Sequence, residues 1–523
     1  MGRPIGLGYT YWTHFAWHGP EDSVLVTDED EIVEIGTASL LAHRGSRDRL
    51  ADCEGAFLTP GLWDSHVHLL AYGKSFRELY LDADLTYDEV LARVRHLAHT
   101  MDTREALIWG AGWSDSQWGI APKAADLSRV AEGHPVALIS HDHHSVWLSQ
   151  EAMATIGLER HTPPVPGGVI ERDIHGVPTG VVRENQVTWV YTRLTSQSPD
   201  DDIRDLKRGL QEMARHGIVG VTSMESREGF IALQRIMGES YETPIRVDVM
   251  LPKDQLTALA ELGVMSRFGH SSFRIQGVKL FIDGALGSRT AWMKNPYEGE
   301  PENCGVLSLE PDLVRSIVEA ADKAGLAVAM HAIGDRAVQI AVKVLRDFDR
   351  PRGVAHRIEH AQLMDDTEIP WLTSRFALSV QPVHMVDDYT IARRHWGERS
   401  LRAYRFQSFW QQGGLVLLGS DAPVATPDPR WGLWMAVHRA PFDRPREVWN
   451  LQEALTPRQA LDGYTRVPAI ANARRSGVLA PGFQADFTFW ASNPERALAE
   501  GNWDALRVVG TVVQGRQVWW NGR

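Results

Sequence analysis

Eight short apolar segments recur along the middle of this chain and constrain its fold more than any other feature. Most of them are followed by a longer stretch of helix-like character, for example residues 313–325 and 365–376. Buried strands that alternate with helical crossovers are typical of a (β/α)8 barrel. The sequence therefore predicts an α/β protein with a TIM-like barrel, whose eight strands lie in residues 62–68, 218–224, 245–251, 275–281, 327–331, 357–361, 377–382 and 415–421.

An insertion is expected between the first two strands. About 150 residues separate them, whereas a βαβ unit needs only about 30. The gap carries elements of its own, with helix-like residues 86–100 and 200–216 and an apolar run at 135–140. We therefore predict an α/β insertion over about residues 75–215. Because it leaves the barrel after a strand, at the face where barrel active sites lie, we expect it to wall the substrate pocket.

The two ends of the chain share the character of short strands. Such runs cover residues 23–27, 31–35, 485–490 and 508–520. Ends that resemble each other, around a middle that differs, predict one small β-sandwich domain built from both termini. We assign it to residues 1–59 and 476–523, with the barrel at 60–475.

Composition and charge exclude several classes of function. The 523 residues contain 54 Lys and Arg against 67 Asp and Glu, and this acidic balance disfavours binding to nucleic acid or anionic membranes. The two cysteines, Cys53 and Cys304, rule out a disulfide scaffold and a cysteine zinc cage. No apolar run is long enough for a membrane span, and the N-terminus lacks the features of a signal peptide. We expect a cytoplasmic protein that acts on a small molecule, with a homodimer as an open alternative.

Two histidines end the first predicted strand. Side chains alternate along a strand, so His66 and His68 point the same way and can share a metal ion. A bare His-x-His pair is common by chance, and two half-exposed strand histidines remain an alternative interpretation.

A lysine lies inside the fourth predicted strand, where a buried cation is costly. One interpretation pairs Lys279 with Asp283 or extends it to solvent. The other makes it a carboxylated lysine, whose carbamate supplies two oxygens to bridge two metal ions.

Three further polar residues end the fifth, sixth and eighth strands. His331 and His360 could each be an ordinary core histidine, and Asp421 could cap the next helix. Because all of them fall at strand ends, we expect them to meet at one face of the barrel. The candidate metal set comprises His66, His68, Lys279, His331, His360 and Asp421. Glu359 adjoins His360 but should point the opposite way, so it is not the obvious partner to fix a histidine tautomer.

The order of the motifs resembles the amidohydrolase superfamily, specifically its YtcJ-like branch, amidohydrolase family 3, which includes N-substituted formamide deformylase. The matching motifs lie at residues 59–69, 144–153, 167–180, 278–292, 331–338, 357–362, 379–384, 419–424 and 477–487. The resemblance covers nearly the whole chain and implies a metal-dependent hydrolase.

The resemblance also implies roles for individual residues. The four histidines of the set would be metal ligands, Lys279 the bridging carbamate, and Asp421 both ligand and general base. Zn²⁺ is the implied cofactor, with one or two ions per chain and other divalent metals as alternatives. Substrate contacts or supporting roles would fall to His144, Asp283, Arg289 and His384. Trp113 is a further candidate substrate contact, independent of the resemblance, because it lies among the tryptophans of residues 109–118 in the insertion.

The function expected from this site is hydrolysis of a C–N bond of amide type by a metal-activated hydroxide. Asp421 would carry the proton from the attacking water to the leaving amine. Tryptophans at residues 109–118 and at Trp292 favour an apolar or aromatic substrate. A deaminase and a cyclic-amide or lactone hydrolase on the same barrel remain alternatives, as does a non-catalytic binding protein.

Overall fold

The computed structural model describes residues 8–81, 85–101, 106–114, 118, 120–140, 145–194, 199–238 and 243–522. The chain forms two compact units. One comprises Met1–Ala71 and Leu206–Arg523, and the other comprises Tyr72–Asp205.

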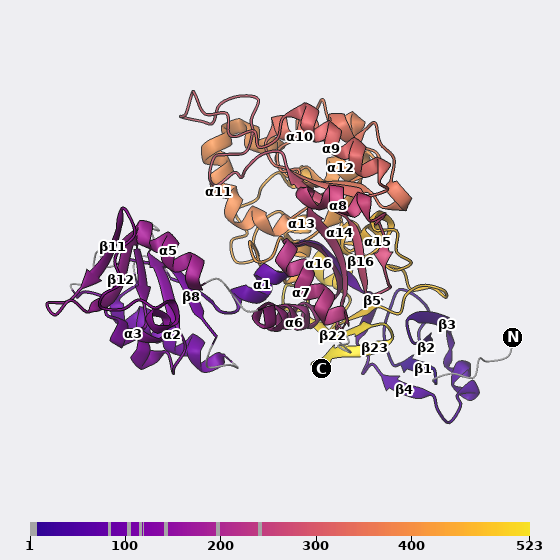
Figure 1. The fold of residues 1–523 in the computed structure, drawn as a ribbon. Helices are drawn as coiled ribbons and strands as arrows, with labels where there is room; N and C mark the ends of the chain where they lie inside the picture. Colours follow the sequence, from indigo (N-terminus) through magenta and orange to yellow (C-terminus); the bar gives the residue numbers. More distant parts are fainter. Residues whose placement is uncertain are drawn as a thin grey trace. The chain divides into compact units, whose positions relative to one another are not determined.

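The larger unit is built around eight parallel strands (Figure 1). In sheet order they are β6 (Leu62–Val67), β13 (Ile218–Met224), β14 (Arg246–Pro252), β16 (Phe273–Phe281), β17 (Ala327–Ala332), β18 (His356–His360), β19 (Phe376–Val380) and β20 (Leu415–Leu418). A short strand, β15 (Phe268–Gly269), pairs antiparallel with β16. Each predicted strand overlaps one of the eight, which confirms the TIM-like barrel.

Hydrogen bonds just beyond the last strand link it back to the first. The Asp421 N–H donates to the His66 carbonyl at 2.7 Å, and the His68 N–H donates to the Ala422 carbonyl at 2.8 Å. Val67 and Ala422 form a parallel bridge at the same place. The carboxyl ends of the first and eighth strands are therefore held side by side.

Helices of the larger unit lie between the barrel strands in the chain or, from α13 onward, follow the last of them, and several pack against the strands. They are α7 (Arg227–Gly238), α8 (Leu256–Glu261), α9 (Pro311–Lys323), α10 (Asp335–Leu345), α11 (Met385–Trp396), α12 (Phe406–Gln411), α13 (Pro429–His438), α14 (Pro457–Tyr464), α15 (Arg466–Ala471) and α16 (Pro494–Ala499).

The two helices predicted within the barrel have different outcomes. The predicted helix at 313–325 is α9, which buries Val314, Val318 and Ala321 along one face. The predicted helix at 365–376 is wrong, because the structure has only a 3-10 turn at Ile369–Trp371 there. Pro370 lies inside this segment, and proline cannot donate the backbone hydrogen bond that a helix interior needs.

Both chain termini contribute a four-stranded sheet to the larger unit. The first sheet contains β1 (Thr10–Thr13), β2 (Ser23–Asp28), β3 (Glu31–Thr37) and β4 (Arg49–Asp52). The second contains β5 (Phe57–Pro60), β21 (Phe487–Trp490), β22 (Val508–Val513) and β23 (Arg516–Trp520). Trp12 of the first sheet packs edge-on against Phe487 of the second in a shared hydrophobic cluster. The boundaries at residues 59 and 476 stay a prediction.

The smaller unit contains a six-stranded sheet. Its strands, in chain order, are β7 (Glu78–Tyr80), β8 (Ile108–Trp113), β9 (Val136–Ser140), β10 (Ser145–Leu148), β11 (Gly168–Arg172) and β12 (Pro178–Glu184). The helices are α2 (Tyr87–Thr100), α3 (Ala124–Val130), α4 (Gln150–Ile156) and α5 (Asn185–Leu194). Two further helices, α1 (Leu69–Ser75) and α6 (Pro199–Arg215), cross from one unit to the other.

The segments predicted for the insertion form regular structure. The predicted helices at 86–100 and 200–216 are α2 and α6, and the run at 135–140 forms β9. A capping box, in which Thr86 and Glu89 bond each other's backbone N–H, begins α2. The division of the chain into domains stays a prediction. In the part of the chain that the structure describes, no helix combines the length and apolar character needed to cross a membrane.

Candidate metal centre

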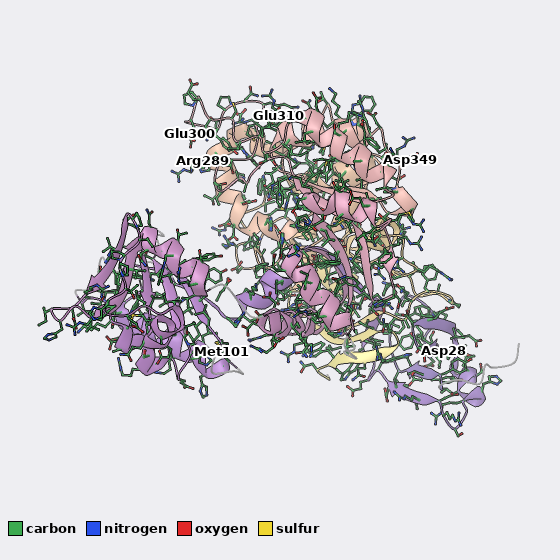
Figure 2. The ribbon with its side chains drawn as sticks, viewed as in Figure 1. Asp28, Met101, Arg289, Glu300, Glu310 and Asp349 are labelled. Atoms are coloured by element: carbon green, nitrogen blue, oxygen red, sulfur yellow. The ribbon has the colours of Figure 1, made fainter. Side chains whose placement is uncertain are left out.

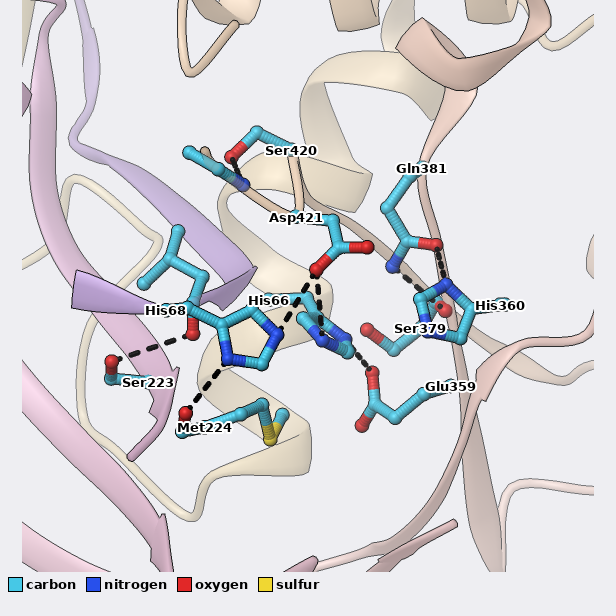
Figure 3. A network of polar contacts seen from close by, with 12 residues as sticks. His66, His68, Ser223, Met224, Glu359, His360, Ser379, Gln381, Ser420 and Asp421 are labelled. Carbon is cyan, nitrogen blue, oxygen red and sulfur yellow. Dashed lines mark hydrogen bonds and ion pairs between the residues drawn. The ribbon is translucent and has the colours of Figure 1, made fainter. Parts of the chain in front are cut away.

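Three predicted ligands meet where the first and eighth barrel strands lie side by side. His66 lies near the carboxyl end of β6, His68 follows its final residue, and Asp421 follows β20 (Figure 3). The Asp421 Oδ1 atom lies 3.4 Å from His66 Nε2 and 3.3 Å from His68 Nε2. His66 and Asp421 are buried, whereas about a third of the His68 side chain is exposed. These three residues form one group that could hold a metal ion.

A second group shares Asp421 with the first. It contains His360, the last residue of β18, and His384, in a 3-10 turn after β19. The His384 Nε2 atom lies 3.8 Å from Asp421 Oδ2, and the His360 and His384 rings stack with centroids 6.3 Å apart. The sequence placed His384 among substrate contacts. In the structure, His384 lies with the candidate metal ligands instead.

His331 and Lys279 lie beside these groups. The His331 ring centroid is 4.5 Å from that of His360. Lys279, on β16, is 5% exposed, and burial lowers the pKa of its amine to about 8 although Glu359 and Asp421 act in the opposite direction. The structure thus gathers the predicted set at one end of the barrel.

The four histidines predicted as ligands each have an outer partner that fixes the ring orientation. His66 Nδ1 lies 2.5 Å from Glu359 Oε2, and His360 Nδ1 lies 2.8 Å from Gln381 Oε1. The other two histidines bond backbone carbonyls, with His68 Nδ1 at 3.0 Å from Met224 and His331 Nε2 at 3.0 Å from Gly284. Three of the rings therefore present Nε2 to the site, and His331 presents Nδ1.

Glu359, which was not the obvious partner from its place in the sequence, is the outer partner of His66. Strand alternation separates it from His360, but its partner is His66 on a distant strand of the barrel. His360 also turns toward the site, because its φ of 71° takes the end of β18 out of the regular strand conformation. The alternation of side chains along one strand could reveal neither the contact between Glu359 and His66 nor the orientation of His360.

The donor atoms at this place suit a divalent cation. Among the described residues, the buried atoms without a hydrogen-bond partner include His66 Nε2, His384 Nε2 and Asp421 Oδ1. Burial lowers the pKa of His66 and of His331 to about 4, so both imidazoles are neutral at neutral pH. Burial alone would raise the pKa of Asp421, yet the surrounding histidines hold it well below its usual range. Neutral imidazoles and an ionised carboxylate are the ligands that zinc and similar metals bind.

Comparison with known proteins decides the family. The model of the amidohydrolase family matches residues 49–519. The chain belongs to the amidohydrolase family.

Individual relatives of this amidohydrolase match it over most of their length. It is 26% identical to the YtcJ protein of Bacillus subtilis, over 96% of this chain and 99% of that protein. It is 30% identical to protein LONG AFTER FAR-RED 3 of Arabidopsis thaliana, over 93% and 87% of the two chains. N-substituted formamide deformylase of Arthrobacter pascens is 24% identical over 92% of both chains. The resemblance to the YtcJ-like branch is confirmed.

A solved structure extends the comparison to three dimensions. An uncharacterized metal-dependent hydrolase from Pyrococcus furiosus aligns with a TM-score of 0.74 and 26% identity, over 93% of this chain and 100% of that chain. This protein is accordingly a metal-dependent amidohydrolase.

Asp283 organises two loops of this amidohydrolase. Its carboxylate accepts the backbone N–H groups of Trp292 at 2.9 Å, Gly334 at 2.8 Å and Ile333 at 3.1 Å. It is 2% exposed, and burial raises its pKa to about 7. These hydrogen bonds tie the loop after β16 to the loop after β17, and they account for an acid at this position.

Two other predicted substrate contacts have structural partners of their own. Arg289 pairs with Glu300 at 2.6 Å, and both are labelled in Figure 2. Trp113 is 1% exposed in the core of the smaller unit, where it packs on Trp118 and donates to the Leu138 carbonyl. A packing role therefore explains Trp113. His144 lies outside the described residues.

Phe281 is a feature of the site that the sequence did not single out. It ends β16, and its ring centroid lies 5.1 Å from that of His331. The residue is nevertheless 48% exposed, and Val424, shortly after Asp421, is 70% exposed. The signal in the sequence was an aromatic residue two positions after Lys279, at the point where a barrel strand ends.

Proposed function

We propose that this amidohydrolase hydrolyses a C–N bond of amide type in a small substrate with an apolar or aromatic part, using one or two divalent metal ions, Zn²⁺ foremost. The observation that carries the proposal is the pair of His–His–carboxylate groups that share Asp421. The proposal is supported by buried atoms of these groups that could bind a metal and have no hydrogen-bond partner among the described residues, namely His66 Nε2, His384 Nε2 and Asp421 Oδ1.

The metal would be held by residues of both groups. His66 and His68 would serve one position and His360 and His384 the other, with Asp421 common to both. When bound, such a cation polarises a carbonyl group and lowers the pKa of water to about 7. We further propose that Lys279 is carboxylated. The lowered pKa of its amine leaves part of it uncharged near neutral pH, and the uncharged amine is the form that reacts with carbon dioxide.

Asp421 would move the proton in this reaction. Its carboxylate is ionised and lies between the two groups, so it can accept a proton from the attacking water. Water oxygen then bonds to the carbonyl carbon, and the proton passes from Asp421 to the leaving nitrogen as the C–N bond breaks. Proton number and charge balance over the cycle.

Apolar side chains beside the site support the proposed substrate class. Phe281 is exposed at the end of β16 and Val424 in the loop after β20, on the side of the barrel where a substrate of the metal centre would approach. The relative from Arthrobacter pascens is named for N-substituted formamides. Formamides that carry an aryl or alkyl group on nitrogen are therefore the first substrates to test.

The test is a substrate panel assayed alongside metal analysis. The panel contains N-substituted formamides, N-acyl amines, N-acyl amino acids, cyclic amides, lactones and aminated heterocycles. We expect release of a free amine from the first two groups by metal-containing protein, and loss of that activity after chelation. Phe281→Ala should raise KM for aryl substrates more than for methyl substrates. Turnover confined to lactones, or to release of ammonia from heterocycles, would contradict the proposal.

A further inference from the structure

His66 differs from His68, His331 and His360 in the charge of its outer partner. Met224 and Gly284 offer backbone carbonyls, and Gln381 offers a neutral amide oxygen. Glu359 offers a carboxylate, at 2.5 Å from His66 Nδ1. Hydrogen bonds to ionised groups are shorter and about twice as strong as neutral ones.

A buried arginine keeps this carboxylate ionised. Arg357 lies two residues before Glu359 on β18, so both side chains point into the barrel. Arg357 Nε lies 2.8 Å from Glu359 Oε1, and the two side chains are 1% and 0% exposed. The guanidinium is anchored in turn by the Ser379 hydroxyl at 2.8 Å and by the Ser65 carbonyl.

We propose that Arg357 and Glu359 form a buried positioning pair for His66. An ionised carboxylate can only accept, so the His66 proton must stay on Nδ1 and the Nε2 lone pair must face the site. The negative partner also makes the imidazole a stronger donor to a metal. The pair thereby raises the affinity of the cation position that His66 shares with His68 and Asp421.

At the position that contains His360 and His384, the hydrogen-bond partner of His360 is neutral. His360 Nδ1 meets Gln381, whose amide nitrogen donates to the Ser379 carbonyl at 3.2 Å. Removing the charge of Glu359 should therefore weaken one cation position and leave the other nearly unchanged. This inference rests on the proposed metal-dependent function.

The test is a metal titration of the chelated protein, with Co²⁺ absorbance and a competing chelator as readouts. Glu359→Gln keeps the size and an acceptor oxygen but removes the charge. We expect the Kd of the position at His66 to rise about 10–100-fold, the usual effect of losing an outer partner, with an altered Co²⁺ spectrum.

Asp248→Asn is the matched control. Asp248 forms a buried pair with Arg474 at 2.6 Å on another barrel strand, and both side chains are 0% exposed. The Asp248→Asn variant should lower the melting temperature as Glu359→Gln does, but it should leave the Kd for the metal unchanged. Glu359→Asp serves where Glu359→Gln fails to fold, because it keeps the charge beside Arg357 and withdraws the oxygen from His66; it should also raise the Kd.

The outcomes separate the inference from the proposed function. An unchanged Kd and spectrum in a folded Glu359 variant, with only the melting temperature lowered, would overturn the positioning pair and leave metal-dependent hydrolysis intact. Wild-type protein that binds no metal would overturn both.

Discussion

Asp421 belongs to both candidate metal groups. Replacing it distinguishes a catalytic role of its carboxylate from a purely structural one. In Asp421→Asn the side chain keeps its shape but cannot take a proton at neutral pH. Losing a general base costs about 10²–10⁴ in rate, and we expect kcat to fall by at least this factor while the circular dichroism spectrum is unchanged. Metal content is measured in parallel. Normal kcat in metal-loaded Asp421→Asn would show that the carboxylate only caps the following segment.

Lys279 gives a second prediction at the scale of a residue. If its amine is carboxylated, Lys279→Ala removes a metal ligand, and elemental analysis should find less metal per chain than in the wild type. Lys294→Ala is the control, because Lys294 pairs with Asp365 at 2.8 Å outside both metal groups. Equal metal content in wild type, Lys279→Ala and Lys294→Ala would rule out the carbamate.

At the scale of elements, the loops after β16 and β17 depend on one carboxylate. Asp283→Ala leaves the backbone N–H groups of Trp292, Ile333 and Gly334 without their acceptor. Each orphaned donor costs ~1–3 kcal/mol, so we expect the free energy of unfolding to fall by about 3 kcal/mol or more in urea denaturation. Asp173→Ala, in an exposed turn of the smaller unit, should have a much smaller effect. Similar losses for both variants would contradict the assigned role of Asp283.

At the scale of the larger unit, one buried arginine ties both terminal segments to the barrel. Arg246 begins β14, and its side chain bonds Asp486, 2.7 Å from Nε, and Asp30. Arg246→Met leaves the buried Asp486 carboxylate unpaired, which costs about 3–5 kcal/mol. We expect the terminal sheets to become sensitive to limited proteolysis. Arg496→Ala, which breaks an exposed pair with Glu500, should leave the cleavage pattern unchanged.

The sequence by itself determined the barrel and most of its candidate ligands. Buried strands are short apolar runs, a property of neighbouring residues, so all eight could be located from the order of residues alone. The ends of parallel strands meet at one face of a barrel, and therefore His66, His68, His331, His360 and Asp421 could be grouped from their places in those runs. The wrong helix prediction at residues 365–376 also had a cause that the sequence itself contains, because Pro370 interrupts that segment.

Only the tertiary structure decided which side chains touch across the barrel. The contact of Glu359 with His66 joins strands that are not neighbours in the sheet, and His384 reaches Asp421 from a turn after β19. Trp113 was grouped with substrate contacts because tryptophans cluster around it, yet it lies in the core of the smaller unit. Such contacts depend on barrel closure and on backbone angles at strand ends, such as the positive φ of His360. Strand periodicity contains no information about barrel closure or about these backbone angles. The partners of the metal-site residues could therefore be identified only from the tertiary structure.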